Sequence, residues 1–130
     1  MKLKKGAFAL LLEGRSPAAT VTLSGEDSGL HGAAEFYPTP LGVVVCAELS
    51  GLPERERAEV FGLSLGGEIT PIFRKSTGEA SAWCAAMTRH RSVGEVLGET
   101  VSVLATPAGH GRRDALRIGR GTVCDARCAL

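Results

Sequence analysis

The chain is a succession of short apolar or alternating segments, and each of them ends at glycine, proline or a polar turn. This pattern constrains the fold more than any other feature, because strands are short whereas helices need longer amphipathic runs. In the clearest segment, residues 41–49, apolar residues occupy alternate positions. Since successive side chains of a strand point to opposite faces, we expect one set to face the core. That set is Val43, Val45, Ala47 and Leu49.

Comparable segments recur at residues 19–23, 32–37, 60–65, 69–73, 80–87, 100–105 and 116–123. The 17 glycines and the low aromatic content agree with many turns between short strands. About seven or eight strands at this spacing predict one antiparallel β-sandwich or barrel. Residues 38–40 should form a turn, because a proline cannot donate a ladder hydrogen bond. Ser92 followed by Glu95 is a capping-box pattern, which predicts one helical turn.

The N-terminus resembles the beginning of a secretory signal, because lysines precede the apolar run 6–12. That run is short for such a signal, and Glu13 and Arg15 introduce charges directly after it. It is also far too short to span a bilayer. We therefore expect a cytoplasmic protein, with secretion as the alternative.

We expect the chain to form one domain with short additions at each end. Residues 1–17 are predicted to be an extension, either a short helix or a strand, that packs on a β-sandwich of residues 18–124. Residues 125–130 are predicted to be a flexible tail. The net charge of +1 argues against the broad basic surface of a nucleic-acid-binding protein. Neither a nucleic acid nor a membrane is therefore expected as a partner.

The four cysteines fall into two groups. Cys46 and Cys84 lie inside apolar stretches, which favours buried and inert thiols. Cys124 and Cys128 lie near the end of the sequence, where their spacing would suit a disulfide or a pair of thiolate ligands. No second Cys/His pair at zinc-site spacing accompanies them. The favoured interpretation is a frayed terminal segment.

Five stretches carry a resemblance to a known family, and they are residues 29–36, 42–53, 61–67, 92–101 and 116–123. In this order and spacing they resemble the copper–zinc superoxide dismutase family, especially a compact bacterial branch of it. The resemblance implies an all-β fold, namely a Greek-key antiparallel β-sandwich or barrel. Because members of the family commonly pair through sandwich faces, it also implies a homodimer.

The resemblance also identifies what this chain lacks. The family has a His-x-His pair of copper ligands, and Ser64 and Gly66 stand at the matching positions. Leu104 stands where the last copper histidine would be. Only residues 68–79 correspond to the long zinc-bearing loop, and they contain neither histidine nor aspartate. Serine, glycine and leucine cannot replace imidazole ligands of copper, so we expect no metal cofactor and no metal catalysis.

The chain has three histidines, His31, His90 and His110, and none falls on a ligand position of the family. His90 lies between two arginines, and neighbouring cations lower the affinity of an imidazole for metals and for protons. We expect all three histidines to be solvated.

The expected function is that of a non-catalytic, superoxide dismutase-like binding or structural module, acting as a homodimer or with an unidentified protein partner. Arg117 matches the arginine with which the family draws in its anionic substrate, and it is the candidate anion-binding residue. Two alternatives remain open. One is a divergent metalloprotein that uses Cys124 and Cys128, and the other is a residual enzyme of the same family.

Overall fold

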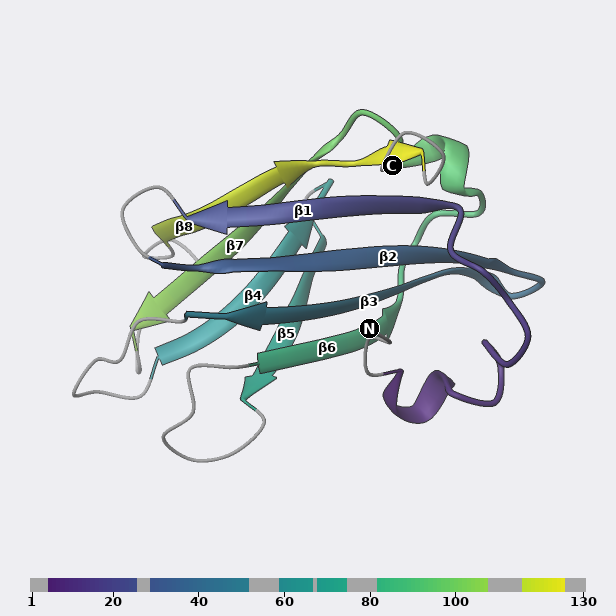
Figure 1. Cartoon of the computed structure of the whole chain (residues 1–130), viewed down its shortest axis with the longest axis horizontal. Helices are drawn as coiled ribbons and strands as arrows, with labels where there is room; N and C mark the ends of the chain where they lie inside the picture. The colour runs from purple at the N-terminus through teal and green to yellow at the C-terminus, as the bar shows by residue number, and fades with distance from the viewer. Residues whose placement is uncertain are drawn as a thin grey trace.

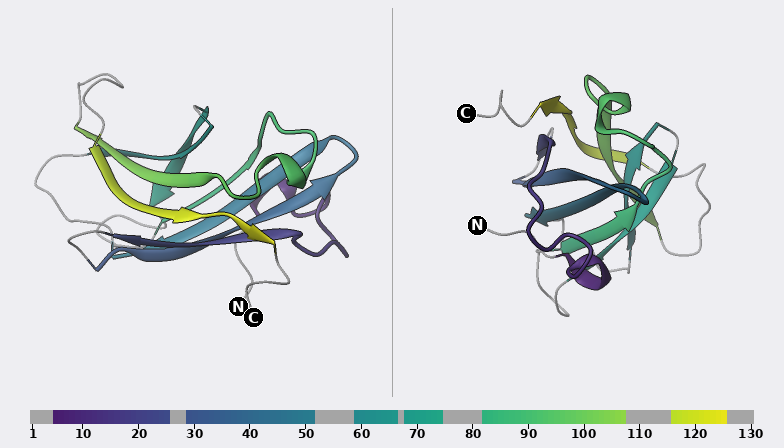
Figure 2. Two further views of the ribbon diagram at one scale, coloured as in Figure 1. Left: turned by 90° about the horizontal axis from the view of Figure 1, so that it is seen from above. Right: turned by 90° about the vertical axis from the view of Figure 1, so that its right-hand side faces the viewer.

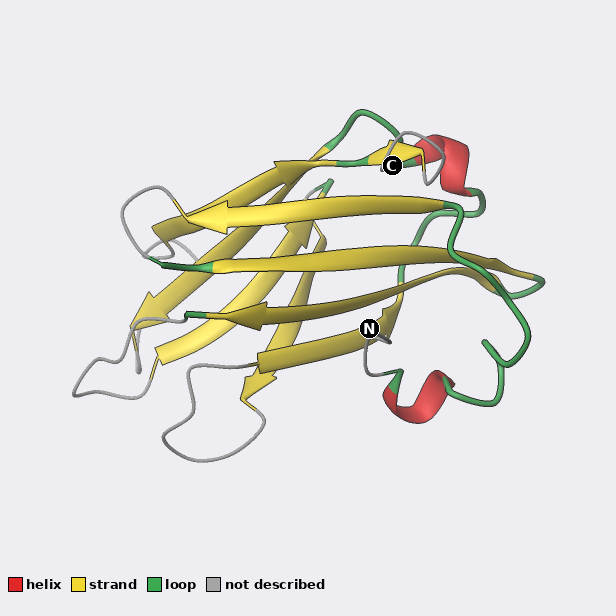
Figure 3. Ribbon diagram, in the orientation of Figure 1, coloured by secondary structure: helices red, strands yellow, loops and turns green. Residues whose placement is uncertain are grey.

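Strands make up most of the described chain (Figure 3). The computed structural model describes residues 5–25, 29–51, 59–66, 68–74, 82–107 and 116–125. These residues form nine strands and two 3-10 turns, and no α-helix. In chain order the elements are η1 (Gly6–Phe8), β1 (Ala19–Gly25), β2 (His31–Thr39), β3 (Gly42–Ser50), β4 (Glu59–Leu65), β5 (Glu68–Arg74), β6 (Ala82–Met87), η2 (Val93–Glu95), β7 (Thr100–Pro107), β8 (Leu116–Thr122) and β9 (Cys124–Asp125).

The strands lie in two layers, β1-β2-β3-β6 and β5-β4-β7-β8, which cross at an angle (Figures 1 and 2). Every pairing is antiparallel. Because β1 pairs with both β2 and β8, and β5 pairs with β6, the layers close into a barrel. The chain changes layer after β3, after β5 and after β6, which gives the Greek-key order. The predicted all-β fold, an antiparallel sandwich or barrel of the copper–zinc superoxide dismutase type, is therefore confirmed.

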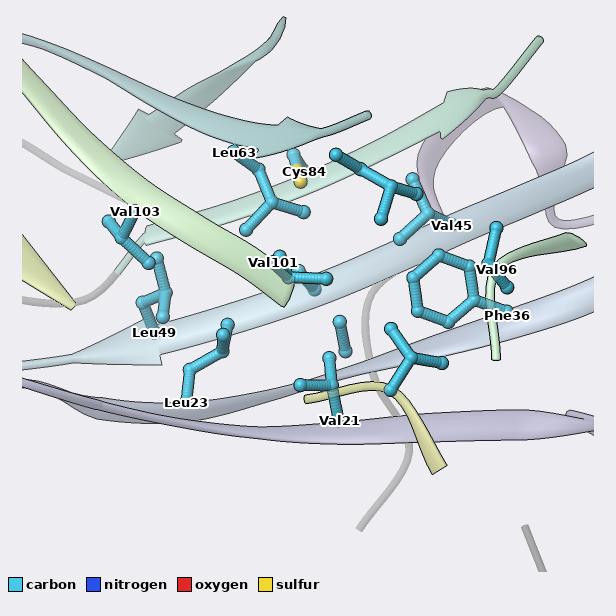
Figure 4. Packing of buried hydrophobic residues seen from close by; sticks show 14 of the residues in the cluster. Val21, Leu23, Phe36, Val45, Leu49, Leu63, Cys84, Val96, Val101 and Val103 are labelled. Atoms are coloured by element: carbon cyan, nitrogen blue, oxygen red, sulfur yellow. The ribbon is translucent and has the colours of Figure 1, made fainter. Parts of the chain in front are cut away.

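The core lies between the layers and takes alternate residues from each strand (Figure 4). The set predicted from residues 41–49 to face inward, Val43, Val45, Ala47 and Leu49, is at most 2% exposed, so this prediction is confirmed. Phe36 of β2 is fully buried and is the largest of the fully buried side chains. Burying a phenylalanine of this kind stabilises a fold by about 1.5–3 kcal/mol. Val93 and Val96, at η2, add to the same cluster.

A second apolar cluster lies on the outer face of β2, β3 and β6. Tyr37, Val44 and Cys46 point away from the core, and Leu12 covers them and is itself fully buried. We call residues 5–15 the N-terminal segment. It contains η1 and a series of turns, so the apolar run for which both a helix and a strand were possible begins as a 3-10 turn. Both faces of β3 are therefore buried, one by the core and one by this segment.

The C-terminal strand β9 pairs with β1 through Thr20↔Cys124 and Ala19↔Asp125. The domain boundary expected at residue 124 thus falls within a paired strand. Residues 1–4 and 126–130, which include most of the expected tail, lie outside the described residues.

Pro38 lies within β2 rather than in the predicted turn, and it pairs with Val43. The reason is that β1 pairs with β2 no farther than Phe36. Beyond that residue β2 has a neighbour on one side only, where a residue without an N–H group is tolerated.

The predicted capping box at Ser92 does not form. In the 3-10 turn of η2 the Glu95 N–H donates to the Ser92 carbonyl at 3.2 Å, and the Ser92 side chain makes no capping hydrogen bond. The Glu95 carboxylate instead accepts from the Arg91 N–H at 3.4 Å. The prediction was wrong because the tighter 3-10 turn uses for its own backbone the N–H that the serine would have capped.

Candidate functional site

Two of the three residues that the resemblance aligns with copper ligands, Ser64 and Leu104, lie on the outer face of the β5-β4-β7-β8 layer. In β4 the side chains of Phe61, Leu63 and Leu65 are buried in the core. Side chains alternate along a strand, so Ser64 faces outward. The half-buried Leu104 of β7 also alternates with buried neighbours and faces the same side.

Strand register arranges this outer face in two rows. One row joins Gly62 of β4 to Leu104 of β7, and Leu104 to Arg117 of β8. The next row joins Ser64 to Ser102, and Ser102 to Arg120. We call these six residues the outer face; they are Gly62, Ser64, Ser102, Leu104, Arg117 and Arg120. Arg117 and Arg120 are exposed, so the outer face presents small side chains bordered by two guanidinium groups.

The chemistry of the outer face does not suit a copper–zinc centre. Its side chains offer hydroxyl and guanidinium groups but neither imidazole nor thiolate, which are the ligands a copper redox site needs. Within the part of the chain that the structure describes, no group of three or more His, Cys, Asp or Glu residues could hold a metal ion. The residues present therefore do not fit the metal centre that the resemblance implies, and no catalytic step is derived through it.

Gly66 stands in a turn and not in a strand. Its φ of +57° lies in the left-handed region, which glycine adopts without a steric cost. Together with residue 67 it joins β4 directly to β5, since Leu65 pairs with Glu68. The strand expected at residues 69–73 is confirmed as β5, and it occupies the first part of the stretch, residues 68–79, that corresponds to the family's zinc-bearing loop. The turn is short enough for β5 to fold straight back on β4, which leaves no room there for a ligand-bearing loop.

His90 approaches Gly66 from the segment between β6 and β7. A Cβ built on Gly66 would lie 3.9 Å from His90 Nε2 and 3.4 Å from Glu99 Oε2. The His90 backbone is held by two hydrogen bonds, one from its N–H to Thr88 Oγ1 at 3.2 Å and one from the Val43 N–H to its carbonyl at 3.2 Å. Its ring is only partly exposed, and Nδ1 is buried with no hydrogen-bond partner among the residues described.

The prediction that all three histidines are solvated is therefore wrong for His90. The neighbouring Arg89 and Arg91 are exposed, whereas the histidine between them turns toward the barrel. Arg89 is held outward by Glu68, whose carboxylate lies 3.1 Å from Arg89 Nε. His31 is exposed, with Nδ1 2.8 Å from the Gly29 carbonyl oxygen. His110 lies outside the described residues.

The cysteines occupy three different environments. Cys84 is buried in the core, and Cys46 is buried under the N-terminal segment on the opposite face of the same layer. Burial is the main cause that raises the pKa of Cys84 to about 12 and that of Cys46 to about 11. Both thiols are therefore protonated and inert at neutral pH, as their apolar surroundings predicted. Cys124 is exposed in β9, and its thiol donates to the Thr122 carbonyl at 3.6 Å; Cys128 lies outside the described residues.

Sequence reasoning placed Ser64, Leu104 and Arg117 by resemblance, and strand register brings Leu104 and Arg117 together as direct neighbours. It did not identify Ser102, although the period of two along β7 places this residue on the same side as Leu104. It also missed Arg120, which lies three residues from Arg117 and shares its side only because of the β-bulge between Val103 and Leu104. It also missed His90 beside Gly66, for which the sequence holds no local signal.

No helix among the described residues has the length and apolar character needed to cross a bilayer. No protein-family model matches this chain, and comparison with curated proteins finds no match either.

Proposed function

We propose that this chain is a non-catalytic relative of the copper–zinc superoxide dismutases that acts as a binding module. The strand order supports the relationship, because it has the Greek-key closure that the sequence resemblance implied. The second part of the proposal is that the chain binds a partner but catalyses no reaction at a metal. It depends on the side chains that occupy the positions of that family's metal ligands.

The observation that carries the proposal is the composition of the two rows on the outer face. Ser64 and Leu104 lie where copper ligands would be, and their direct cross-strand neighbours in β4 and β7 are Ser102 and Gly62. Restoring a single histidine would therefore not restore a donor set, since a copper site needs several imidazole or thiolate ligands at once. The direct β4–β5 turn at Gly66 supports the same conclusion for the zinc ligands.

Arg117 is proposed to take part in binding a partner. A guanidinium group presents donors in a planar fork that matches carboxylates and other oxyanions. In the outer face it stands beside the half-buried Leu104, so an anionic group bound there would lie next to an apolar surface. A second copy of the chain or another protein with an exposed carboxylate is the kind of partner proposed.

Metal analysis of untagged protein tests the non-catalytic part of the proposal. After incubation with Cu²⁺ and Zn²⁺ followed by dialysis, we expect far less than one metal ion per chain and no superoxide dismutation above the buffer rate. Stoichiometric metal together with dismutation would contradict the proposal. Metal that disappears in the Cys124→Ser/Cys128→Ser double variant would instead identify the alternative metalloprotein, in which soft thiolates hold the ion.

Sedimentation velocity and a titration with an acidic peptide test the binding part. A specific dimer should bury more than about 1,000 Å² in total and should persist at micromolar concentration. Arg117→Gln is expected to weaken binding of the acidic peptide, or the dimer, by roughly tenfold, as for a hydrogen bond to a charged group. Arg15→Gln, at an exposed arginine of the N-terminal segment, is the matched control. An equal effect of the two substitutions would show only a general charge effect and would count against a site at Arg117.

A further inference from the structure

The two rows of the outer face continue onto β5. Gly62 pairs with Pro71 and Ser64 pairs with Ile69, so each row crosses all four strands of the layer. Residues directly opposite each other in an antiparallel pair point to the same side of the sheet. Ile69 is half-buried and Pro71 is exposed. An apolar border on β5 therefore lies at one end of the rows, and the two arginines of β8 lie at the other.

The middle of the rows is made of small side chains. A Cβ built on Gly62 would lie 2.7 Å from Ile69 Cγ2, so the isoleucine side chain reaches over the glycine. Ser64 and Ser102 are half-buried, as is Leu104, the large apolar residue that β7 contributes. A partner lying across β4 and β7 would therefore meet low side chains with the apolar atoms of Ile69 and Leu104 among them.

A β-bulge places both arginines of β8 on this side. Arg117 and Arg120 are three residues apart, a separation that in a regular strand puts side chains on opposite faces. The bulge inserts Ile118 as an extra residue of β8 opposite β7. Arg117 therefore lies opposite Leu104, and Arg120 lies opposite Ser102, only two positions away in β7. Two residues of a strand span about 7 Å, which sets the spacing of the two arginines along the strand.

The charge of the rows is positive. Arg117 and Arg120 are both exposed, and the other six residues of the rows carry no ionisable side chain. A symmetric pairing of two copies through these rows would therefore supply neither arginine with a carboxylate. A partner that brings its own carboxylates gains from both guanidinium groups, because each presents a planar fork of donors that matches a carboxylate.

We propose that the outer face, extended by Ile69 and Pro71, binds an extended segment of another protein in which two carboxylates lie two residues apart. The inference rests on the proposed function as a binding module and names the partner of the same site. In an extended peptide, residues i and i+2 project to the same side about 7 Å apart, which is the spacing of Arg117 and Arg120. Such a segment lying along β7 and β8 would also cover Leu104, and apolar burial adds to the affinity. A small free anion would meet the arginines without covering this leucine.

Two peptides of identical composition test the spacing. One has the sequence Val-Thr-Glu-Thr-Glu-Thr-Val and the other Val-Thr-Glu-Glu-Thr-Thr-Val, each with blocked ends and a fluorescent label. Adjacent glutamates of an extended chain point to opposite sides, so the second peptide brings one carboxylate to the arginines. Fluorescence anisotropy with the full chain should give a Kd roughly tenfold lower for the first peptide, as for one hydrogen bond to a charged group. Binding should weaken as the salt concentration rises.

Substitutions show whether both arginines take part. Arg117→Gln and Arg120→Gln should each weaken binding of the first peptide by roughly tenfold and remove its advantage over the second. Arg15→Gln is the matched control, because this exposed arginine belongs to the N-terminal segment, which packs on the other layer. It should change the Kd by less than about twofold. An unchanged thermal unfolding temperature would show that the variants are folded, and the comparison of the two peptides on the unsubstituted protein does not depend on them.

Three results would overturn the inference. Equal affinity for the two peptides would show that the spacing of the carboxylates is not recognised. A loss in Arg117→Gln without a loss in Arg120→Gln would exclude the paired site but would leave the proposed role of Arg117 standing. Absence of binding by either peptide would exclude this class of partner, whereas the non-catalytic part of the proposed function is decided separately by the metal and dismutation measurements.

Discussion

Leu12 is the residue on which attachment of the N-terminal segment to the barrel depends most. It is fully buried against Tyr37, Val44 and Cys46, while its backbone N–H donates to a carbonyl within the segment itself. Apolar contact therefore supplies much of the attachment. Substituting Leu12 with alanine should release the segment while the barrel remains folded.

The size of the effect can be worked out from the atoms removed. Leu12→Ala deletes three carbon atoms from a fully buried site, which costs about 2.4 kcal/mol at 0.8 kcal/mol per methylene. A residual cavity beneath the segment would raise the cost toward about 3 kcal/mol. If a cost of about 3 kcal/mol falls on docking of the segment alone, the population of molecules whose segment is detached from the barrel rises by roughly 150-fold.

The thiol of Cys46 reports this opening, because Leu12 belongs to the cluster that buries it. Burial, assisted by Glu35 and opposed by Lys5, raises the pKa of Cys46 to about 11, so the docked form holds almost no reactive thiolate. In a Cys124→Ser/Cys128→Ser background, we expect Leu12→Ala to accelerate modification of Cys46 by a disulfide reagent at pH 8 by roughly 150-fold. Leu10→Ala, which deletes the same atoms from an exposed position of the same segment, should change the rate less than about twofold.

Modification of Cys84 provides the internal reference, since Cys84 lies in the core and becomes reactive only when the barrel opens. Equal acceleration of Cys46 and Cys84 would show that the segment and the barrel unfold together, which would refute a separate docking step. An unchanged rate at Cys46 would refute it as well, because the segment would then not be what protects this thiol.

Two further predictions concern the barrel itself. Because burial raises the pKa of Cys84 to about 12 and that of Cys46 to about 11, above the ordinary value of 9.0, their contribution to stability is complete below pH 9 and is lost as the pH rises from 9 to about 12. The free energy of unfolding in urea should therefore fall over this window, and Cys84→Ala should flatten the fall; an unchanged slope would contradict the assignment. Gly121→Ala should destabilise the barrel by roughly 3 kcal/mol or more in the same assay, because a Cβ at Gly121 would lie 2.1 Å from the Thr22 carbonyl oxygen. Gly29→Ala, where a Cβ would meet nothing within 4 Å, should be nearly neutral, and similar costs at the two glycines would count against this close approach.

The strands were predictable because their signal is local. In residues 41–49 the residues that face the core recur at every second position. This alternation can be recognised from the segment alone, without knowing which strand lies opposite. The burial of Val44 and Cys46 on the other side was not predictable, because it depends on a segment about thirty residues earlier in the chain folding over them. β5 exceeds its predicted range of 69–73 by one residue at each end, because the pairing of Leu65 with Glu68 carries the ladder across the turn at Gly66.

The candidate site shows the same division between local and distant information. That Ser64 faces outward follows from alternation with Leu63 and Leu65. That Leu104 lies opposite Arg117 does not follow from either strand alone, because a β-bulge between Val103 and Leu104 shifts the register of β7 against β8. The turn of His90 toward Gly66 depends on contacts between the β6–β7 connection and the β4–β5 turn, which are far apart in the sequence.

Closure of the barrel also limits how this protein can associate. In the order of the described strands each member of the eight-stranded ring has a neighbour on both sides, and β1 takes up β9 as well. An unpaired strand edge is the feature through which sheets of different molecules join by backbone hydrogen bonds. Among the described pairings that route is closed only in part, because β5 and β6 pair at Phe73↔Trp83 and Arg74↔Ala82 alone and β1 pairs with β2 no farther than Phe36. Where neighbouring strands are fully paired, recognition of this protein falls to its side chains, and single substitutions on that surface should be enough to switch an interaction off.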